Sequence, residues 1–119
     1  MSQIVACKNN TGIVMATDSH AAAFDSRGQI VTLKINRLIQ LTTHTAILTS
    51  GAPEGESMCR ALQSFLAQEA LENIEEIYGA ALPFLVSEYE QFMRQKCATL
   101  PMDPIHYVTF ILGGYSVND

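Results

Sequence analysis

A polar break near the start of the chain, Lys8-Asn9-Asn10-Thr11-Gly12, restricts the fold more than any other stretch. It separates two short apolar runs that are rich in strand-forming residues, Ile4 to Cys7 and Ile13 to Thr17. Asn and Gly tolerate the positive φ angles that tight hairpin turns require. The pattern therefore predicts a β-hairpin, and this hairpin returns Ser2 to the neighbourhood of Asp18.

Three groups capable of chemistry lie at the corners of the predicted strands: the Ser2 hydroxyl, the Asp18 carboxylate and the Lys34 amine. A serine at the chain start can act as a nucleophile, with its own α-amine as the general base. An α-amine titrates at about 7.7–8.0, whereas a lysine titrates near about 10.4. Lys34, held charged by Asp18, is expected to depress the pKa of the amine and hydroxyl beside it. The three residues predict an N-terminal nucleophile, provided that Met1 is removed.

The order of these residues resembles the proteasome β-type subunits, which are N-terminal-nucleophile hydrolases. Met15-Ala16-Thr17-Asp18-Ser19 and Leu33-Lys34-Ile35 occupy the places of the family's acid and lysine motifs. The likeness continues through Thr49-Ser50-Gly51-Ala52 and ends with Phe110-Ile111-Leu112-Gly113-Gly114-Tyr115. No single motif is long, but their combined order covers nearly the whole chain. The resemblance implies an α+β protein with the four-layer αββα sandwich of this family.

The resemblance also implies roles for individual residues. Ser2, Asp18 and Lys34 would be catalytic, the Gly51 N–H would be the oxyanion donor, and Ser19 and His20 would border the substrate cleft. Two of these roles have a simpler alternative, because Gly51 can belong to a plain strand-to-helix turn and His20 to an exposed loop. The family usually has Thr where this chain has Ser2. The hydroxyl is retained, but the methyl group that restricts its rotamer is absent.

The expected domain is incomplete. Residues 1–119 correspond to the first half of the family's domain, and the strands and helices that complete the sandwich would follow the strand ending in Leu112-Gly113-Gly114. We therefore expect a fragment, a truncated product or a chain completed by association, and we do not expect an active monomer. Two alternatives remain open: a non-catalytic structural subunit that only assembles, and an unrelated acidic α/β binding domain.

The composition of the chain excludes several classes of binding partner. A net charge of −5 and a pI near 5.0 argue against nucleic acid and anionic membranes. The apolar runs are too short to cross a bilayer, and no signal peptide is recognisable, so the cytoplasm is the expected location. His20, His44 and His106 share no metal-ligand spacing, so neither a metal nor a cofactor is expected. The resemblance implies a peptide or unfolded protein as substrate and a homo-oligomer or ring as the assembly.

Periodicity and turn residues predict the remaining elements. Cys7, in a predicted strand, is expected to pack as a small core hydrophobe. The second helix carries Asn73 as its N-cap and Pro83 as an expected kink. The other expected elements are a loop at 18–29, strands at 30–41 and 45–49 around a turn at 42–44, helices at about 54–72 and from 73 to about 97, a rigid connector at 100–104 and a buried strand at 106–112.

Overall fold

The computed structural model describes residues 3–10, 12–71, 73–99 and 104–115, with the side chains of 97–99 left out of the description. Its described part is an α+β structure of seven strands and two α-helices. The elements are β1 Ile4–Lys8, β2 Ile13–Thr17, β3 His20–Phe24, β4 Ile30–Lys34, β5 Leu38–Thr42, β6 Thr45–Gly51, α1 Glu54–Glu69, α2 Ile74–Thr99, a 3₁₀ turn at Pro104–His106 and β7 Val108–Gly114.

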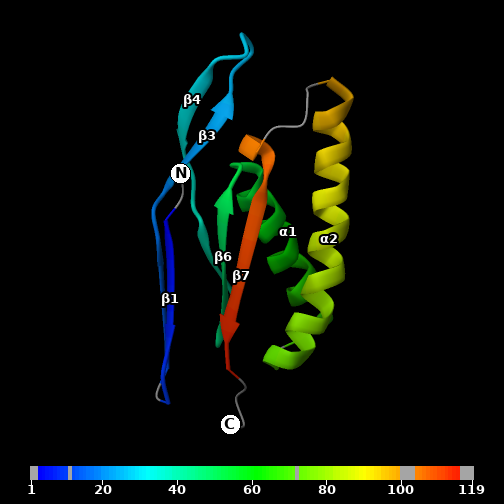
Figure 1. The fold of residues 1–119 in the computed structure, drawn as a ribbon. Coiled ribbons are helices and arrows are strands. Elements are labelled where there is room, and N and C mark those ends of the chain that lie inside the picture. Colours follow the sequence, from blue (N-terminus) through cyan, green and yellow to red (C-terminus); the bar gives the residue numbers. More distant parts are fainter. Residues whose placement is uncertain (1–2, 11, 72, 100–103, 116–119) are drawn as a thin grey trace.

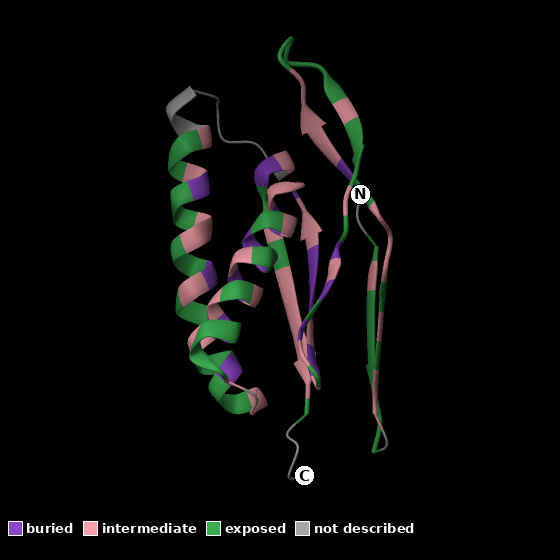
Figure 2. Ribbon diagram, turned by 180° about the vertical axis from the view of Figure 1, so that it is seen from behind, coloured by how far each residue is buried: buried purple, intermediate pink, exposed green. Residues whose placement is uncertain are grey.

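These elements form three layers (Figure 1). The β1–β2 and β3–β4 hairpins form the first layer, the antiparallel sheet β5–β6–β7 forms the second, and the two helices cover the far face of that sheet. The buried residues concentrate where the sheet meets the helices (Figure 2). The core residues of this contact are Ile39, Leu41, Ile47, Ala52, Met58, Cys59, Leu62, Leu66, Ile77, Ala81, Leu85 and Phe92.

The predicted first hairpin is confirmed over the described residues. β1 and β2 pair antiparallel, and the turn is fastened by hydrogen bonds between Asn9 and Gly12. Ala6 opposes Met15 on the face that packs against the sheet, where Met15 Sδ lies beside Gly113. Cys7 lies on the opposite, outer face and is exposed, so its predicted place in the core is wrong. The physical reason is that a two-stranded layer buries only one of its faces.

The predicted loop at residues 18–29 is wrong over much of its length. His20–Phe24 forms β3 and pairs with β4 in a second hairpin, leaving only residues 25–29 as its turn. Asp25 Oδ1 accepts the N–H groups of Arg27 and Gln29 over 2.9 Å each, which closes that turn. Alanine is a weak strand former, but strand propensity is mostly a matter of packing. Ala21 is buried, and this packing decides the conformation.

The central sheet begins after an interruption that the sequence pattern did not predict. The single strand predicted over 30–41 is two strands, β4 and β5, separated by Ile35, Asn36 and Arg37. The turn between β5 and β6 lies at residues 43–44, within the predicted 42–44, and Thr42 belongs to β5. β6 runs two residues further than predicted, to Gly51, and pairs along its whole length with β7. β6 is thus the central strand of the sheet.

Both predicted helices are present. α1 ends at Glu69, three residues before the predicted boundary, because Ala70 adopts the left-handed conformation with φ 54°. Asn73 Oδ1 accepts the Glu75 N–H over 2.9 Å, which confirms Asn73 as the cap of α2. The helix continues on both sides of Pro83, whose exposed position leaves the missing N–H on the solvent side. Pro83 therefore does not divide the helix.

The last strand begins later than predicted. Pro104 to His106 forms a 3₁₀ turn, and β7 covers Val108–Gly114 rather than 106–112. His106 is buried between the rings of Phe24 and Phe92, at centroid separations of 5.9 and 6.3 Å, so it is a packing histidine. Residues 100–103 of the predicted connector lie outside the described residues.

Candidate active site

The described chain begins beside Asp18. The Gln3 N–H donates a hydrogen bond to Asp18 Oδ2 over 3.0 Å, and the Asp18 N–H donates to the Gln3 carbonyl over 3.1 Å. These bonds extend the β1–β2 register by one pair beyond Ile4 and Thr17. Ser2, the predicted nucleophile, lies outside the described residues. It is bonded directly to Gln3, the residue that these two hydrogen bonds hold against Asp18.

The Asp18 carboxylate forms an ion pair with Arg37, whose Nε lies 3.3 Å from Asp18 Oδ1. The Nε–H is donated elsewhere, to the His20 carbonyl over 3.0 Å, so the contact with Oδ1 is one of charge and not a hydrogen bond. Oδ1 is buried and accepts no hydrogen bond from the described residues. Buried carboxylate oxygens normally have a donor. Oδ1 therefore has the capacity to accept one from an amine or hydroxyl beside it.

Arg37 connects three parts of the site and is almost wholly buried, at 1% exposure. Its Nη2 donates to the His20 carbonyl over 2.7 Å and to the Gly51 carbonyl over 2.8 Å, and its Nη1 donates to the Thr49 carbonyl over 3.3 Å. Burial lowers the pKa of this guanidinium from its usual value, and the negative charge of Asp18 raises it in opposition. Arg37 thereby joins the Asp18 carboxylate to the end of β6.

Lys34 is the last residue of β4 and lies at the end of the second hairpin that is next to Asp18 and Ser19. It opposes His20 in the β3–β4 register, and the Ile35 N–H donates to the Ser19 carbonyl over 2.9 Å. The backbone thus brings residues 34–35 alongside residues 19–20. The ion pairs of the described residues include none between Lys34 and Asp18; the carboxylate is paired with Arg37. The sequence pattern named the wrong basic residue as the partner of Asp18.

Gly51 ends β6 with φ 98°, a conformation that L side chains rarely adopt. A Cβ at this position would collide with the backbone carbonyl of Tyr107, the residue directly before β7. The Ala52 N–H donates to this same Tyr107 carbonyl over 3.0 Å, and the Gly51 carbonyl accepts from Arg37. Packing alone therefore explains why residue 51 is a glycine, which leaves its predicted oxyanion role to be tested on other grounds.

The two predicted cleft residues differ in their surroundings. Ser19 is half-buried and its carbonyl accepts from Ile35, whereas the His20 side chain is exposed and its carbonyl accepts from Arg37. A hollow of about 510 Å³ lies farther along the second hairpin, between its tip, the start of α1 and the end of α2. Neither Ser19 nor His20 lines it. Its lining residues include Phe24, Pro53, Glu54, Lys96 and His106.

Arg37 is the residue of this site that sequence reasoning missed. Its signal was present: a single arginine stands directly before the apolar run Leu38-Ile39, inside a stretch predicted to be strand. Arginine is almost never fully buried unless it is paired. An arginine at the start of a buried strand therefore needs a carboxylate or carbonyl groups as partners, but the sequence alone does not identify them.

The described residues contain no group of three or more His, Cys, Asp or Glu side chains placed to hold a metal ion. Among the helices of the described chain, neither combines the length and apolar character that crossing a membrane requires. A scan against protein-family models and a search of curated proteins give no match to the chain.

Proposed function

We propose that the chain is a proteasome-like N-terminal-nucleophile hydrolase subunit that cleaves peptide or amide bonds with Ser2 after removal of Met1. Its three layers would then be part of an αββα sandwich. The observation that carries the proposal is the pair of hydrogen bonds between Gln3 and Asp18, together with Asp18 Oδ1, which accepts no hydrogen bond from the described residues. They bring a carboxylate with one buried oxygen to the residue that follows the proposed nucleophile.

The chemistry assigned to these groups is acyl transfer. The Ser2 oxygen attacks the carbonyl carbon of a peptide bond, and the Ser2 α-amine accepts the hydroxyl proton. The resulting ammonium returns the proton to the leaving amine as the C–N bond breaks, which leaves an ester on Ser2. Water, deprotonated by the same amine, then attacks the ester and releases the carboxylic acid. The Gly51 N–H is the proposed donor to the oxyanion in both steps.

Asp18 and the two basic residues have distinct parts in this proposal. Asp18 Oδ1 accepts a hydrogen bond from the α-ammonium that forms during each step, because a carboxylate stabilises a neighbouring cation. Arg37 is a positioning residue, since it holds Asp18 and the Gly51 carbonyl from inside the fold. Lys34, at the adjacent sheet end, lowers the pKa of the nucleophile's amine through its charge.

The test is the intact mass of the purified full chain before and after reaction with a peptide epoxyketone, which captures a hydroxyl and an α-amine together. The expected result is a chain lacking Met1 that gains one adduct, with the adduct lost in Ser2→Ala. Ser87→Ala is the matched control, because Ser87 is an exposed serine on α2. It is expected to keep the adduct.

Three outcomes would contradict the proposal: retention of Met1, absence of an adduct on the processed chain, or an adduct that persists in Ser2→Ala. The first two favour the second candidate function, a subunit that assembles without catalysis, whereas the third shows that a group other than Ser2 reacts. Two observations already support that candidate. Packing accounts for Gly51, and Lys34 is not the ion-pair partner of Asp18 among the described residues.

A further inference from the structure

The β4–β5 connection, residues 35–37, is hydrogen-bonded to three different segments. Ile35 donates its N–H to the carbonyl of the residue directly before β3, and the Arg37 carbonyl accepts an N–H from β6, each over 2.9 Å. Between them, the Asn36 N–H donates to Glu56 Oε1 over 3.0 Å, and Glu56 lies in the first turn of α1. Each residue of the connection is therefore held by a separate element.

Both basic residues of the candidate active site depend on this connection. Lys34 stands directly before it, and Arg37 is its last residue. Arg37 also forms the ion pair with Asp18 and donates to the Gly51 carbonyl. The position of the β4–β5 connection therefore sets where these two positive charges lie relative to the carboxylate.

Glu56 has two ordinary reasons to stand at the start of α1. An acidic residue in the first turn of a helix interacts favourably with the helix dipole. Glu56 Oε2 also lies 3.6 Å from Arg60 Nη2, in an i,i+4 ion pair whose side chains are partly exposed. Neither reason requires the other oxygen, Oε1, to bind a backbone N–H that is 20 residues away in the sequence.

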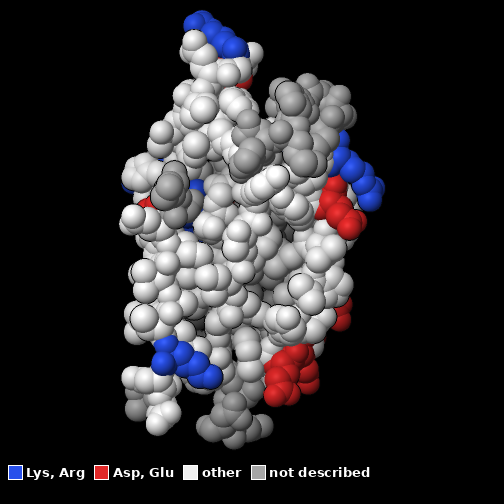
Figure 3. Space-filling view, viewed as in Figure 1, with Lys and Arg blue, Asp and Glu red and all other residues white. Residues whose placement is uncertain are grey.

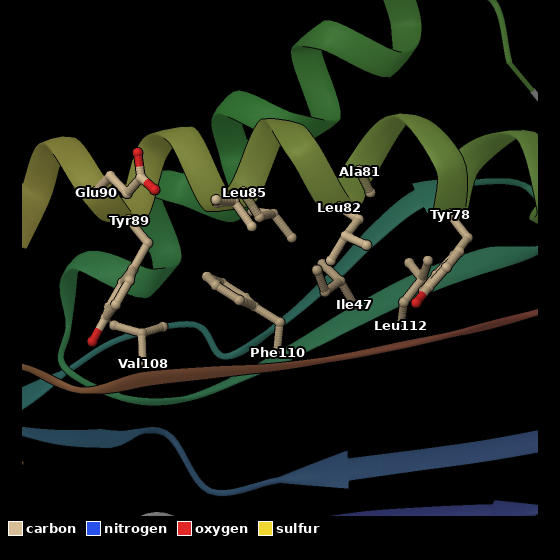
Figure 4. Close-up of a pocket in the computed structure, with 11 residues that line it drawn as sticks. Ile47, Tyr78, Ala81, Leu82, Leu85, Tyr89, Glu90, Val108, Phe110 and Leu112 are labelled. Atoms are coloured by element: carbon tan, nitrogen blue, oxygen red, sulfur yellow. The ribbon is translucent and has the colours of Figure 1, made fainter.

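Glu90 on α2 provides a comparison. It forms the same kind of i,i+4 ion pair, with Arg94 over 3.7 Å, and Figure 4 shows its carboxylate directed away from β7. Figure 3 shows that the charged side chains on this face of the molecule lie at its margins. Charges in such places remain hydrated, and their ion pairs contribute little to stability. Glu56 differs because one of its oxygens joins a helix to the connection that carries Arg37.

We infer that Glu56 is a positioning residue for the proposed hydrolysis. By binding the Asn36 N–H, it fixes the β4–β5 connection and, through it, both basic residues of the candidate active site. A hydrogen bond to a carboxylate is stronger than one between neutral groups. A displacement of about 1 Å in a catalytic group can cost about 100-fold in rate. The catalytic part of this inference rests on the proposed function, and Glu56 acts in it through the backbone of Asn36.

The rate of adduct formation by the full chain with the peptide epoxyketone measures this effect. Glu56→Ala is expected to slow the reaction about three- to tenfold, the factor that corresponds to the loss of one hydrogen bond. Glu56→Gln keeps an acceptor oxygen in place of Oε1 and is expected to react at close to the wild-type rate. Arg60→Ala and Glu90→Ala are the matched controls, because each removes an i,i+4 ion pair and leaves the Asn36 bond intact.

Nuclear magnetic resonance of isotope-labelled protein gives a second measurement, on Arg37 itself. A buried guanidinium N–H that donates a hydrogen bond exchanges slowly with water, so the Arg37 Nε–H is expected to give a protected resonance. Glu56→Ala is expected to shift this resonance and to accelerate its exchange, whereas Glu56→Gln and Arg60→Ala keep it. Urea denaturation of each variant shows whether stability changes without any change at Arg37, which is the result of a merely structural role.

The two measurements separate this inference from the proposed function. A wild-type chain that forms no adduct overturns the proposed function, and the Arg37 resonance then decides whether Glu56 fixes the connection. If wild type reacts and Glu56→Ala reacts equally fast, the inference is wrong while the proposed function stands. A Glu56→Gln variant as slow as Glu56→Ala, or an unchanged Arg37 resonance in Glu56→Ala, overturns the inference as well.

Discussion

At the scale of single residues, Arg37 is the most consequential side chain of the described fold. A buried charge is costly unless its partners satisfy it, and Arg37 has one carboxylate and the carbonyls of His20, Thr49 and Gly51. These partners come from two separate segments, residues 18–20 and residues 49–51. Arg37 therefore acts on the relative positions of β3, β6 and Asp18, which no local sequence pattern specifies.

Replacing Arg37 with leucine should lower the free energy of unfolding by about 3–5 kcal/mol, because it leaves Asp18 without its ion-pair partner and three carbonyls without their donor. Urea denaturation followed by circular dichroism measures this change. Arg27→Leu is the matched control: Arg27 is exposed in the turn of the second hairpin, and its replacement should change stability by less than about 0.5 kcal/mol. Equal effects of the two substitutions would refute this assignment.

Replacing a glycine with alanine should have opposite effects on stability at Gly51 and at Gly79. Gly51→Ala should cost about 2 kcal/mol or more, because it forces a side chain into a left-handed conformation and against the Tyr107 carbonyl. Gly79→Ala should instead stabilise the protein by about 0.5–1 kcal/mol, since Gly79 lies inside α2 with open space around its Cα. Thermal unfolding of the two variants measures both changes. A tolerated Gly51→Ala would show that the β6–β7 end is not packed as described.

At the scale of elements, two of the three cysteines, Cys7 and Cys59, lie in different layers of the fold. Cys59 lies on α1 and is fully buried against the core, whereas Cys7 lies on the outer face of β1. Burial, reinforced by Glu56 and opposed by Arg60, raises the pKa of Cys59 from 9.0 to about 12. A thiol that keeps its proton is a poor nucleophile.

Iodoacetamide at pH 8 should therefore modify Cys7 rapidly and Cys59 only after unfolding. Cys97 is replaced by serine for this experiment because its side chain lies outside the described residues. The raised pKa also means that the stability contributed by protonated Cys59 is complete below pH 9 and is lost as the pH rises toward about 12. Stability should consequently fall more steeply over this interval in wild type than in Cys59→Ala. Modification of native Cys59 at pH 8 would contradict its placement in the core.

The elements also show why some sequence predictions succeeded. The first hairpin, both helices and the Asn73 cap depend on interactions between residues close in the sequence, such as turn residues, capping side chains and helical periodicity. β3 and the interruption between β4 and β5 depend instead on strand pairing and on the burial of Arg37. Alanine and arginine carry little local preference for these conformations, so their tertiary neighbours decide them.

At the scale of the whole molecule, the buried residues are distributed unevenly among the three layers. The core lies between the central sheet and the helices, while the outer face of the β1–β2 hairpin and the β7 edge stay exposed among the described residues. Val5, Cys7, Val14 and Ala16 make that outer face apolar. An isolated two-stranded hairpin is marginally stable.

The sequence by itself determined the α+β class, the two helices and the first hairpin, which brings Gln3 to Asp18, because each follows from local turn chemistry and hydrophobic periodicity. Only the tertiary structure decided that Arg37, and not Lys34, is the ion-pair partner of Asp18, and that Gly51 must lack a side chain beside Tyr107. Both facts arise where segments distant in sequence meet. Desolvation and steric contact act there between groups whose proximity no single stretch of sequence encodes.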